Sequence, residues 1–205
     1  MLDAGTLKIA MRAISDTMKN SRSYLIELDQ RNGDGDLGIS MDEGFAAACA
    51  SLDASGETDL GKLMIGAGKA FNEVAPSSLG TILSFMMMGM ARVLKGHETA
   101  DAALLGEALR GGVDKIMERA NSRPGEKTVL DALDPAVRAL CDHAPEGFRA
   151  ALQAAKAAAI TGAENTKTMK AVHGRAAYYG DKTIGLVDGG AVAGMLIFQA
   201  LAGIV

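Results

Sequence analysis

The sequence predicts an all-α protein with about eight helices, arranged as an antiparallel bundle or closed helical barrel. Apolar residues roughly follow the helical period along the first helical stretch, and no segment alternates convincingly apart from a weak strand candidate at Thr183–Val187. Alanine, the best helix former, is abundant, whereas aromatic residues make up only 4% of the chain. At 205 residues the chain is long enough for one good-sized core. Because we see no internal repeat or linker, we expect a single domain over residues 1–205.

The first half of the chain contains four expected helices, separated by polar or proline-containing turns. Ser40 followed by Glu43 has the form of a capping box, which predicts that a helix begins at Ser40. Thr58 is a candidate cap for the next helix, and Pro76 breaks the pattern before the fourth. The expected ranges are approximately Thr6–Leu28, Ser40–Leu52, Thr58–Val74 and Leu79–Leu94.

The second half predicts four more helices and one long connection. Thr99 is the candidate cap of the fifth helix, and a loop with Pro124 and Gly125 follows it. The expected ranges are approximately Thr99–Ala120, Val129–Cys141, Pro145–Met169 and the C-terminal stretch. The segment Lys170–Asp188 has four glycines and little helical period. Loops longer than about a dozen residues are uncommon in compact domains unless they are functional.

Charge and hydropathy exclude several classes of protein. A net charge of −4 argues against a nucleic-acid-binding surface. The apolar stretches Leu79–Leu94 and Gly189–Val205 are shorter than the roughly 20 residues that span a bilayer, so we expect buried helices and no membrane partner. Cys49 and Cys141 lack metal-type spacing and are expected to be free, buried thiols. With no targeting signal evident, these features predict a cytoplasmic protein.

The chemistry is concentrated between Leu28 and Gly38. Asp29, Asp34 and Asp36 place three carboxylates within eight residues, and glycines separate or follow them. Glycine gives such a loop access to backbone conformations closed to other residues, so the carboxylates can curl around one point. Hard oxygen ligands suit Mg²⁺ or Ca²⁺. The loop therefore predicts a metal site.

Three readings of this loop are open. An EF-hand count from Asn32 puts Asp34, Asp36 and Glu43 at loop positions 3, 5 and 12, but it puts Leu37 where glycine is needed and leaves Asp29 without a role. A Mg²⁺ site that holds nucleotide phosphates uses a few carboxylates and leaves the other positions to water and phosphate. The third reading is a solvated acidic turn, which explains neither the carboxylate density nor the interleaved glycines.

Three blocks of residues, in order, resemble the nucleotide-binding L subunit of dihydroxyacetone (glycerone) kinases, the DAK2 domain. The blocks lie in Leu28–Phe45, Pro124–Asp131 and Gly174–Asp188, and the resemblance covers nearly the whole chain. It implies a barrel of eight antiparallel helices with ADP or ATP bound at one end. It also implies that Asp29, Asp34 and Asp36 hold two Mg²⁺ ions against the phosphates.

The resemblance further implies a set of nucleotide contacts. These are Leu37, Gly38, Ile39, Ser40, Ser78, Leu79, Ala120, Val129, Arg175, Asp188, Gly189 and Gly190. Two departures stand out. Many family members have His where this chain has Leu37, which suggests a different substrate or phosphate donor. Gly189 replaces a family proline, so that loop is expected to be more mobile.

The chain is expected to be a phosphotransferase subunit that is active only with a partner. Beyond the metal carboxylates we find no candidate general base and no acceptor pocket, so no catalytic residue is assigned. The resemblance implies a separate K-type subunit that holds a small ketose or polyol. The donor is either exchanging ATP or bound ADP that a phosphotransferase-system protein rephosphorylates. A homo-oligomer is compatible with this reading. The alternatives are a non-catalytic nucleotide-binding regulator and a Ca²⁺-binding helical protein.

Overall fold

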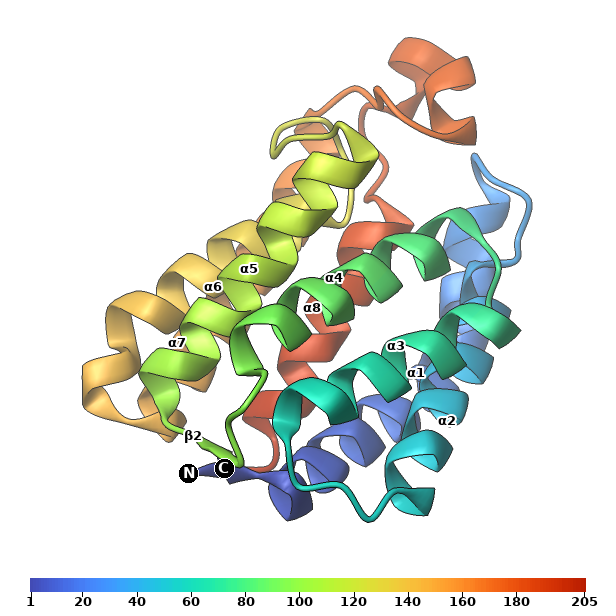
Figure 1. The fold of residues 1–205 in the computed structure, drawn as a ribbon. Coiled ribbons are helices and arrows are strands. Elements are labelled where there is room, and N and C mark those ends of the chain that lie inside the picture. The colour runs from blue at the N-terminus through green and yellow to red at the C-terminus, as the bar shows by residue number, and fades with distance from the viewer.

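The computed structural model describes residues 1–205 as a closed ring of eight α-helices (Figure 1). Consecutive helices pack against each other, and the last packs on the first, which closes the ring. The α-helices are α1 (Ala4–Gln30), α2 (Leu37–Ala54), α3 (Leu60–Val74), α4 (Ser78–Leu94), α5 (Ala102–Ala120), α6 (Leu130–His143), α7 (Phe148–Asn165) and α8 (Gly189–Ala202). The all-α barrel expected from the sequence is confirmed.

Short 3-10 helices and one pair of very short strands complete the fold. The 3-10 helices are η1 (Ala144–Glu146), η2 (Thr166–Thr168) and η3 (Arg175–Thr183), and the strands are β1 (Leu2–Asp3) and β2 (Thr99–Ala100). The strands pair antiparallel, with Leu2 opposite Ala100. They tie the N-terminus to the connection between α4 and α5.

The core is built from the inward faces of all eight helices. Forty-five buried residues form one continuous cluster. Small residues let neighbouring helices approach closely: a Cβ added at Gly89 of α4 would lie 2.3 Å from the carbonyl oxygen of Gly111 in α5. The ring also contains an apolar cavity of about 370 Å³ that is partly open to solvent and is lined in part by Met86, Met87 and Met90. The methionines of α4 are thus largely interior residues, although Met88 is exposed.

The predicted starts of α2, α3 and α5 were wrong, because an aspartate rather than the expected serine or threonine occupies the N-cap position of each. Helix α2 begins at Leu37, with Asp36 as its N-cap residue, so Ser40 lies in the first turn and the predicted capping box does not form. Asp59 rather than Thr58 caps α3, and Asp101 rather than Thr99 caps α5. Each of these two carboxylates accepts a hydrogen bond from a first-turn N–H. The neighbouring threonine is therefore not needed as the acceptor.

The region after α6 also differs from expectation. Gly147, with φ 93°, interrupts the predicted Pro145–Met169 helix, so that α7 begins at Phe148 and is flanked by η1 and η2. The long connection Lys170–Asp188 contains η3, and the weak strand predicted at Thr183–Val187 does not form. Cys49 and Cys141 are both free, as expected, but Cys141 is exposed rather than buried.

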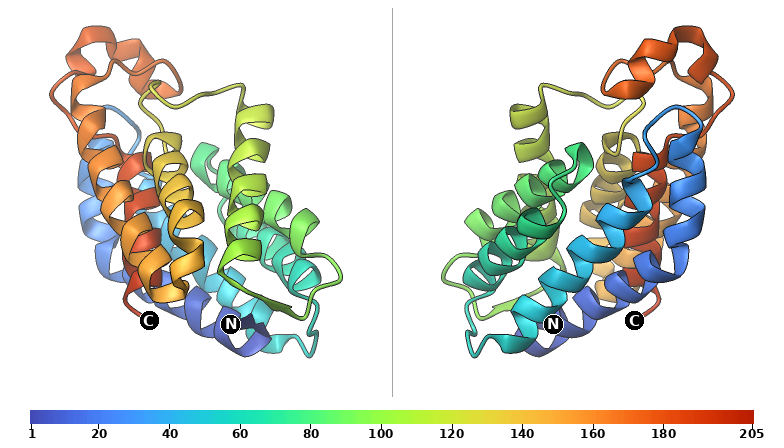
Figure 2. Two further views of the ribbon diagram at one scale, coloured as in Figure 1. Left: turned by 90° about the vertical axis from the view of Figure 1, so that its left-hand side faces the viewer. Right: turned by 90° about the vertical axis from the view of Figure 1, so that its right-hand side faces the viewer.

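The two ends of the ring differ in content. The termini lie close together at one end, whereas the aspartate loop, the α5–α6 connection and η3 lie at the other (Figure 2). Because neighbouring helices alternate in direction, α2, α4, α6 and α8 all begin at this second end. None of the helices combines the length and the apolar character needed to cross a membrane.

Candidate functional site

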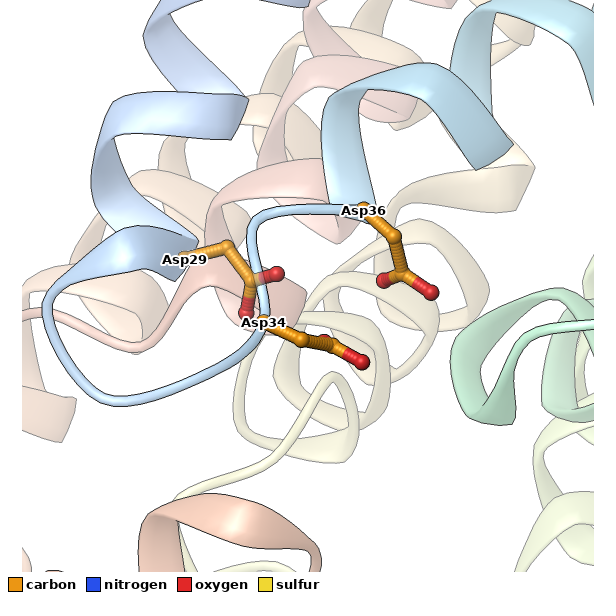
Figure 3. Close-up of side chains that lie close together, drawn as sticks. All are labelled: Asp29, Asp34 and Asp36. Carbon is orange, nitrogen blue, oxygen red and sulfur yellow. The ribbon is translucent and has the colours of Figure 1, made fainter.

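The three aspartates predicted as metal ligands lie together at the end of the ring where α2 begins. Asp29 is on the last turn of α1, and Asp34 and Asp36 are on the loop that leads to α2 (Figure 3). One carboxylate oxygen from each lies within 4.8 Å of the others. Glu43, which an EF-hand would need, is not part of the cluster. The arrangement therefore favours the Mg²⁺ reading, in which Asp29 has a role.

The loop folds around Asp29. Its Oδ2 accepts hydrogen bonds from the backbone N–H of Gly35 (2.8 Å) and Leu37 (3.4 Å). Gly35 has φ 80°, in the left-handed region that favours glycine. A Cβ at Gly33 would lie 2.1 Å from Asp29 Oδ1. The glycines noted in the sequence are therefore required for the loop to close on the carboxylate.

The cluster carries more negative charge than the chain compensates. Arg175 at the start of η3 is the one cation paired with it, through Nη2 at 2.7 Å from Asp34 Oδ2. Burial raises the pKa of Asp36, and the nearby charges of Asp34 and Asp29 raise it further. Three hard oxygen donors with one arginine leave an excess of negative charge that fits a divalent cation such as Mg²⁺.

Next to the carboxylates, the first turn of α2 presents backbone donors. The N–H of Leu37 donates to Asp29, and that of Ser40 donates to the carbonyl oxygen of Asp36 (2.9 Å). The N–H groups of Gly38 and Ile39 have no partner within the chain. Unpaired N–H groups at a helix N-terminus, together with the helix dipole, favour bound phosphate. Leu37, Gly38 and Ser40 are buried, and Ile39 is exposed.

Two further helix starts carry predicted nucleotide contacts. In α4, the Oγ of Ser77 accepts from Gly80 N–H (3.1 Å), which leaves the N–H groups of Ser78 and Leu79 without a partner in the chain. In α8, Asp188 is the N-cap and its Oδ2 accepts from Ala191 N–H (2.7 Å). Gly189 and Gly190 form the first turn of α8.

The structure brings α8 next to α2 and α6. A Cβ at Gly189 would lie 2.7 Å from Leu37 Cδ2, and one at Gly190 would lie 3.4 Å from the backbone nitrogen of Val129. Val129 is the N-cap residue of α6 and is 3% exposed. Ala120 is half-buried on the last turn of α5. All the predicted contacts thus lie on elements at the same end of the ring.

A buried lysine at this end of the ring was not predicted from the sequence. Lys127, in the α5–α6 connection, is 3% exposed, and its Nζ donates to the carbonyl oxygens of Thr166 and Leu186. The only indication in the sequence was that Lys127 lies in the block Pro124–Asp131, which resembles the DAK2 family. The same connection is joined to the long loop by His173, whose Nε2 lies 2.6 Å from Glu126 Oε2.

The fold and the site define a class of protein: a helical barrel with a carboxylate loop and several helix N-termini gathered at one end, suited to a divalent cation and phosphate groups. The chain belongs to the DAK2 domain family, whose model matches residues 32–203.

Similar proteins include two bacterial subunits of nearly the same length. The ADP-binding subunit DhaL of the PEP-dependent dihydroxyacetone kinase of Escherichia coli is 30% identical, over 91% of this chain and 90% of the relative. The corresponding subunit of kinase 1 of Listeria innocua is 31% identical, over 94% of this chain and 93% of the relative. The crystal structure of dihydroxyacetone kinase from C. freundii in complex with AMP-PNP and Mg²⁺ superposes with a TM-score of 0.79 at 26% identity. That match covers 98% of this chain and 34% of the other.

Proposed function

We propose that this chain is the Mg²⁺-dependent ADP- or ATP-binding subunit of a dihydroxyacetone-kinase-type phosphotransferase. It would pass the γ-phosphate to a small ketose or polyol held on a separate K-type subunit. The observation that carries the proposal is that three carboxylates lie next to unpaired backbone N–H groups at the start of α2. The names of the two bacterial subunits, and the AMP-PNP and Mg²⁺ in the C. freundii structure, support it.

In this proposal Asp29, Asp34 and Asp36 would hold Mg²⁺, for which we favour two ions. When bound, Mg²⁺ would neutralise phosphate charge and orient the phosphoryl group. The chain's own part is to bind and orient. Phosphate oxygens would accept from the free N–H groups of Gly38 and Ile39 and of Ser78 and Leu79.

The remaining contacts would form the rest of the nucleotide site. Arg175 would move from Asp34 to a phosphate, because a guanidinium pairs readily with phosphate oxygens. The adenosine end would lie against Ala120 and Val129. The residues Leu37, Ser40, Asp188, Gly189 and Gly190 would complete the walls.

The acceptor would come from the partner. Phosphoryl transfer to a hydroxyl needs a group that takes its proton. Three carboxylates engaged with metal ions are poor candidates for that role, and we assign none of them as the base. The acceptor pocket and the base are therefore proposed to lie on the K-type subunit.

Two phosphoryl donors are compatible with such a subunit. Either ATP exchanges with ADP in each cycle, or ADP stays bound and a phosphotransferase-system protein rephosphorylates it. The names of both bacterial relatives specify a PEP-dependent kinase with an ADP-binding subunit, which favours the second scheme. We further propose that residues 1–205 act as one nucleotide-binding domain in the cytoplasm.

Calorimetric titration with ADP and with ATP, each with and without Mg²⁺, tests the proposal. The protein is first analysed for nucleotide retained through purification. Tight Mg²⁺-dependent binding, or retained ADP, is expected. Retained ADP that does not exchange supports the phosphotransferase-system scheme, whereas free exchange with ATP supports direct use of ATP. Absence of nucleotide binding, both alone and with a K-type subunit, would refute the proposal.

A further inference from the structure

Lys127 is the one lysine or arginine among the buried residues of this protein. Its backbone has φ 61°, in the left-handed region that side chains other than glycine rarely adopt. Burying an ammonium group is costly unless it is paired and hydrogen-bonded. A buried lysine on a strained backbone at the proposed nucleotide site therefore needs a specific explanation.

The ammonium group joins segments that are far apart in the sequence. Its Nζ lies 2.6 Å from the carbonyl oxygen of Thr166, at the end of α7, and also donates to the carbonyl oxygen of Leu186, just before α8. Thr166 in turn accepts, through Oγ1, a hydrogen bond from the N–H of Asp188 (2.9 Å). One side chain thus connects the α5–α6 loop, the end of α7 and the start of α8.

Two carboxylates complete this network. Asp188 caps α8, and Asp131 in the first turn of α6 accepts from the N–H groups of Gly125 (2.5 Å) and Thr128 (2.7 Å). Both carboxylates attract the ammonium group of Lys127. The loop that carries Lys127 is therefore folded onto α6 by the Asp131 carboxylate, while the Asp188 carboxylate acts on the ammonium group through its charge.

These contacts bear on residues already placed in the proposed site. Gly190 lies two residues after Asp188, and a Cβ added to it would be 3.4 Å from the backbone nitrogen of Val129, which is two residues after Lys127. We propose that Lys127 is a positioning residue of the nucleotide site: its ammonium group donates to the carbonyl oxygens of Thr166 and Leu186 and attracts the Asp188 carboxylate without a direct ion pair, and thereby holds the start of α8 against Val129. The inference rests on the proposed function, because it assigns the network a role in nucleotide binding.

The titration of Asp188 gives this role a measurable signature. The pKa of Asp188 is raised to about 6, mainly by burial and also by the charge of Asp131. The helix-cap hydrogen bond and the charge of Lys127 act in the opposite direction. Lys127 and Asp131 are the charged groups that face Asp188 from the α5–α6 loop and from α6. With Lys127 removed, the pKa of Asp188 is expected to rise further, so the carboxyl would be partly protonated near neutral pH.

The first experiment compares ADP binding in the presence of Mg²⁺ from pH 6 to pH 9. The variants are Lys127→Met and, as a matched control, Lys167→Met, which removes an exposed lysine from η2. We expect weaker binding for Lys127→Met, by about twofold at pH 7 and about fivefold at pH 6 if the pKa of Asp188 rises by one unit from about 6, with recovery toward pH 9 as Asp188 ionises. Lys167→Met is expected to follow the unmodified protein. Unchanged affinity, or a loss that is equal at every pH, would overturn the proposal.

A second measurement needs no nucleotide. Because the pKa of Asp188 in the folded state lies above its usual 3.8, its stabilising contribution is complete at low pH and is lost as pH rises through the folded-state value. In the unmodified protein that loss is nearly complete by about pH 7. In Lys127→Met it is expected to continue to higher pH, so Tm falls between pH 7 and pH 9, and adding Asp188→Asn should abolish the extra fall.

Together the two measurements separate failure of this inference from failure of the proposed function. If the unmodified protein binds no ADP, alone or with a K-type subunit, yet Lys127→Met shows the extra fall in Tm, the proposed function fails and only the electrostatic coupling of Lys127 to Asp188 remains. If ADP binds normally and neither pH profile changes, the inference fails alone. Lys127→Gln, which keeps an N–H donor but no charge, replaces the Met variant if that variant does not fold, and the same pH profiles are expected.

Discussion

Asp36→Asn separates a cation-binding role from a structural role for the aspartate loop. Asp36 is the N-cap residue of α2, but its side chain makes no capping hydrogen bond. Its pKa is raised by partial burial and by the charges of Asp34 and Asp29. The ionised carboxylate therefore does not stabilise the folded chain. Asparagine has nearly the same shape, and the substitution therefore removes mainly one charge.

The expected effect on the nucleotide-free protein is small and favourable. The carboxylate oxygens lie within 4.8 Å of one another. At such a separation two unit charges repel by about 1 kcal/mol in bulk water, and by more inside a protein. Asp36 is only partly desolvated, and more than a third of the residue is exposed to solvent, so we use the lower figure. We expect Asp36→Asn to be as stable as the unmodified chain or up to about 1 kcal/mol more stable, a rise in Tm of at most ~4 °C.

The effect on ligand binding is large and opposite. At a Mg²⁺–ADP concentration 100 times the dissociation constant, binding stabilises the unmodified protein by about 2.7 kcal/mol. For a chain of this size that corresponds to a rise in Tm of roughly 5–10 °C. If loss of one cation ligand weakens binding about 100-fold, the same concentration gives only ~0.4 kcal/mol, a rise of about 1 °C.

Thermal unfolding with and without Mg²⁺–ADP measures both effects. Asp142→Asn is the matched control, because Asp142 is exposed near the end of α6, at the opposite end of the ring. The control should retain the full ligand-induced rise. A full rise in Asp36→Asn would refute the cation-binding role, and a nucleotide-free Tm that falls by several degrees would identify Asp36 as a structural residue.

Three other substitutions test the site and the core. Arg175→Gln removes the cation paired with Asp34, so calorimetry should show tighter binding of Mg²⁺ alone and weaker binding of ADP; unchanged values for both would contradict the pairing. Gly38→Ala would place a Cβ 2.2 Å from the carbonyl oxygen of Arg22, and we expect a loss of about 1–3 kcal/mol in denaturant unfolding. Gly56→Ala, with open space around it, is its control and should change little. Leu133→Ala, at a fully buried position of α6, should cost about 2–5 kcal/mol, and a loss under 1 kcal/mol would be inconsistent with a packed core.

Much of the fold follows from local patterns, and the helix starts show where such patterns fail. Apolar stretches, read together with candidate caps and with proline, glycine and polar breaks, were sufficient to find all eight α-helices. The start of α2 was misplaced because Ser40 and Glu43 match a capping box. In the structure the helix begins at Leu37, where the Asp29 carboxylate accepts hydrogen bonds from the N–H groups of Gly35 and Leu37. This helix start depends on how the loop folds around Asp29, which apolar periodicity does not describe.

Site residues that are close together in the sequence could be predicted, whereas those that only the fold brings together could not. Asp29, Asp34 and Asp36 are close in sequence, so their grouping could be predicted from spacing and glycine content. Lys127 contacts residues 39 and 59 positions away, and nothing near it in the chain indicates burial. The residue types are ordinary; only the packing of α6, α7 and α8 brings them together.

The placement of both termini at the end of the ring away from the aspartate loop limits how this fold can be tethered to a partner. A linker from either terminus must travel the length of the barrel before anything attached to it can reach the nucleotide. Helix α1, with 27 residues, is about 40 Å long at 1.5 Å per residue. An extended chain covers at most about 3.5 Å per residue. A fused acceptor domain therefore needs roughly a dozen or more linker residues, whereas an affinity tag at either terminus leaves the mouth of the site free.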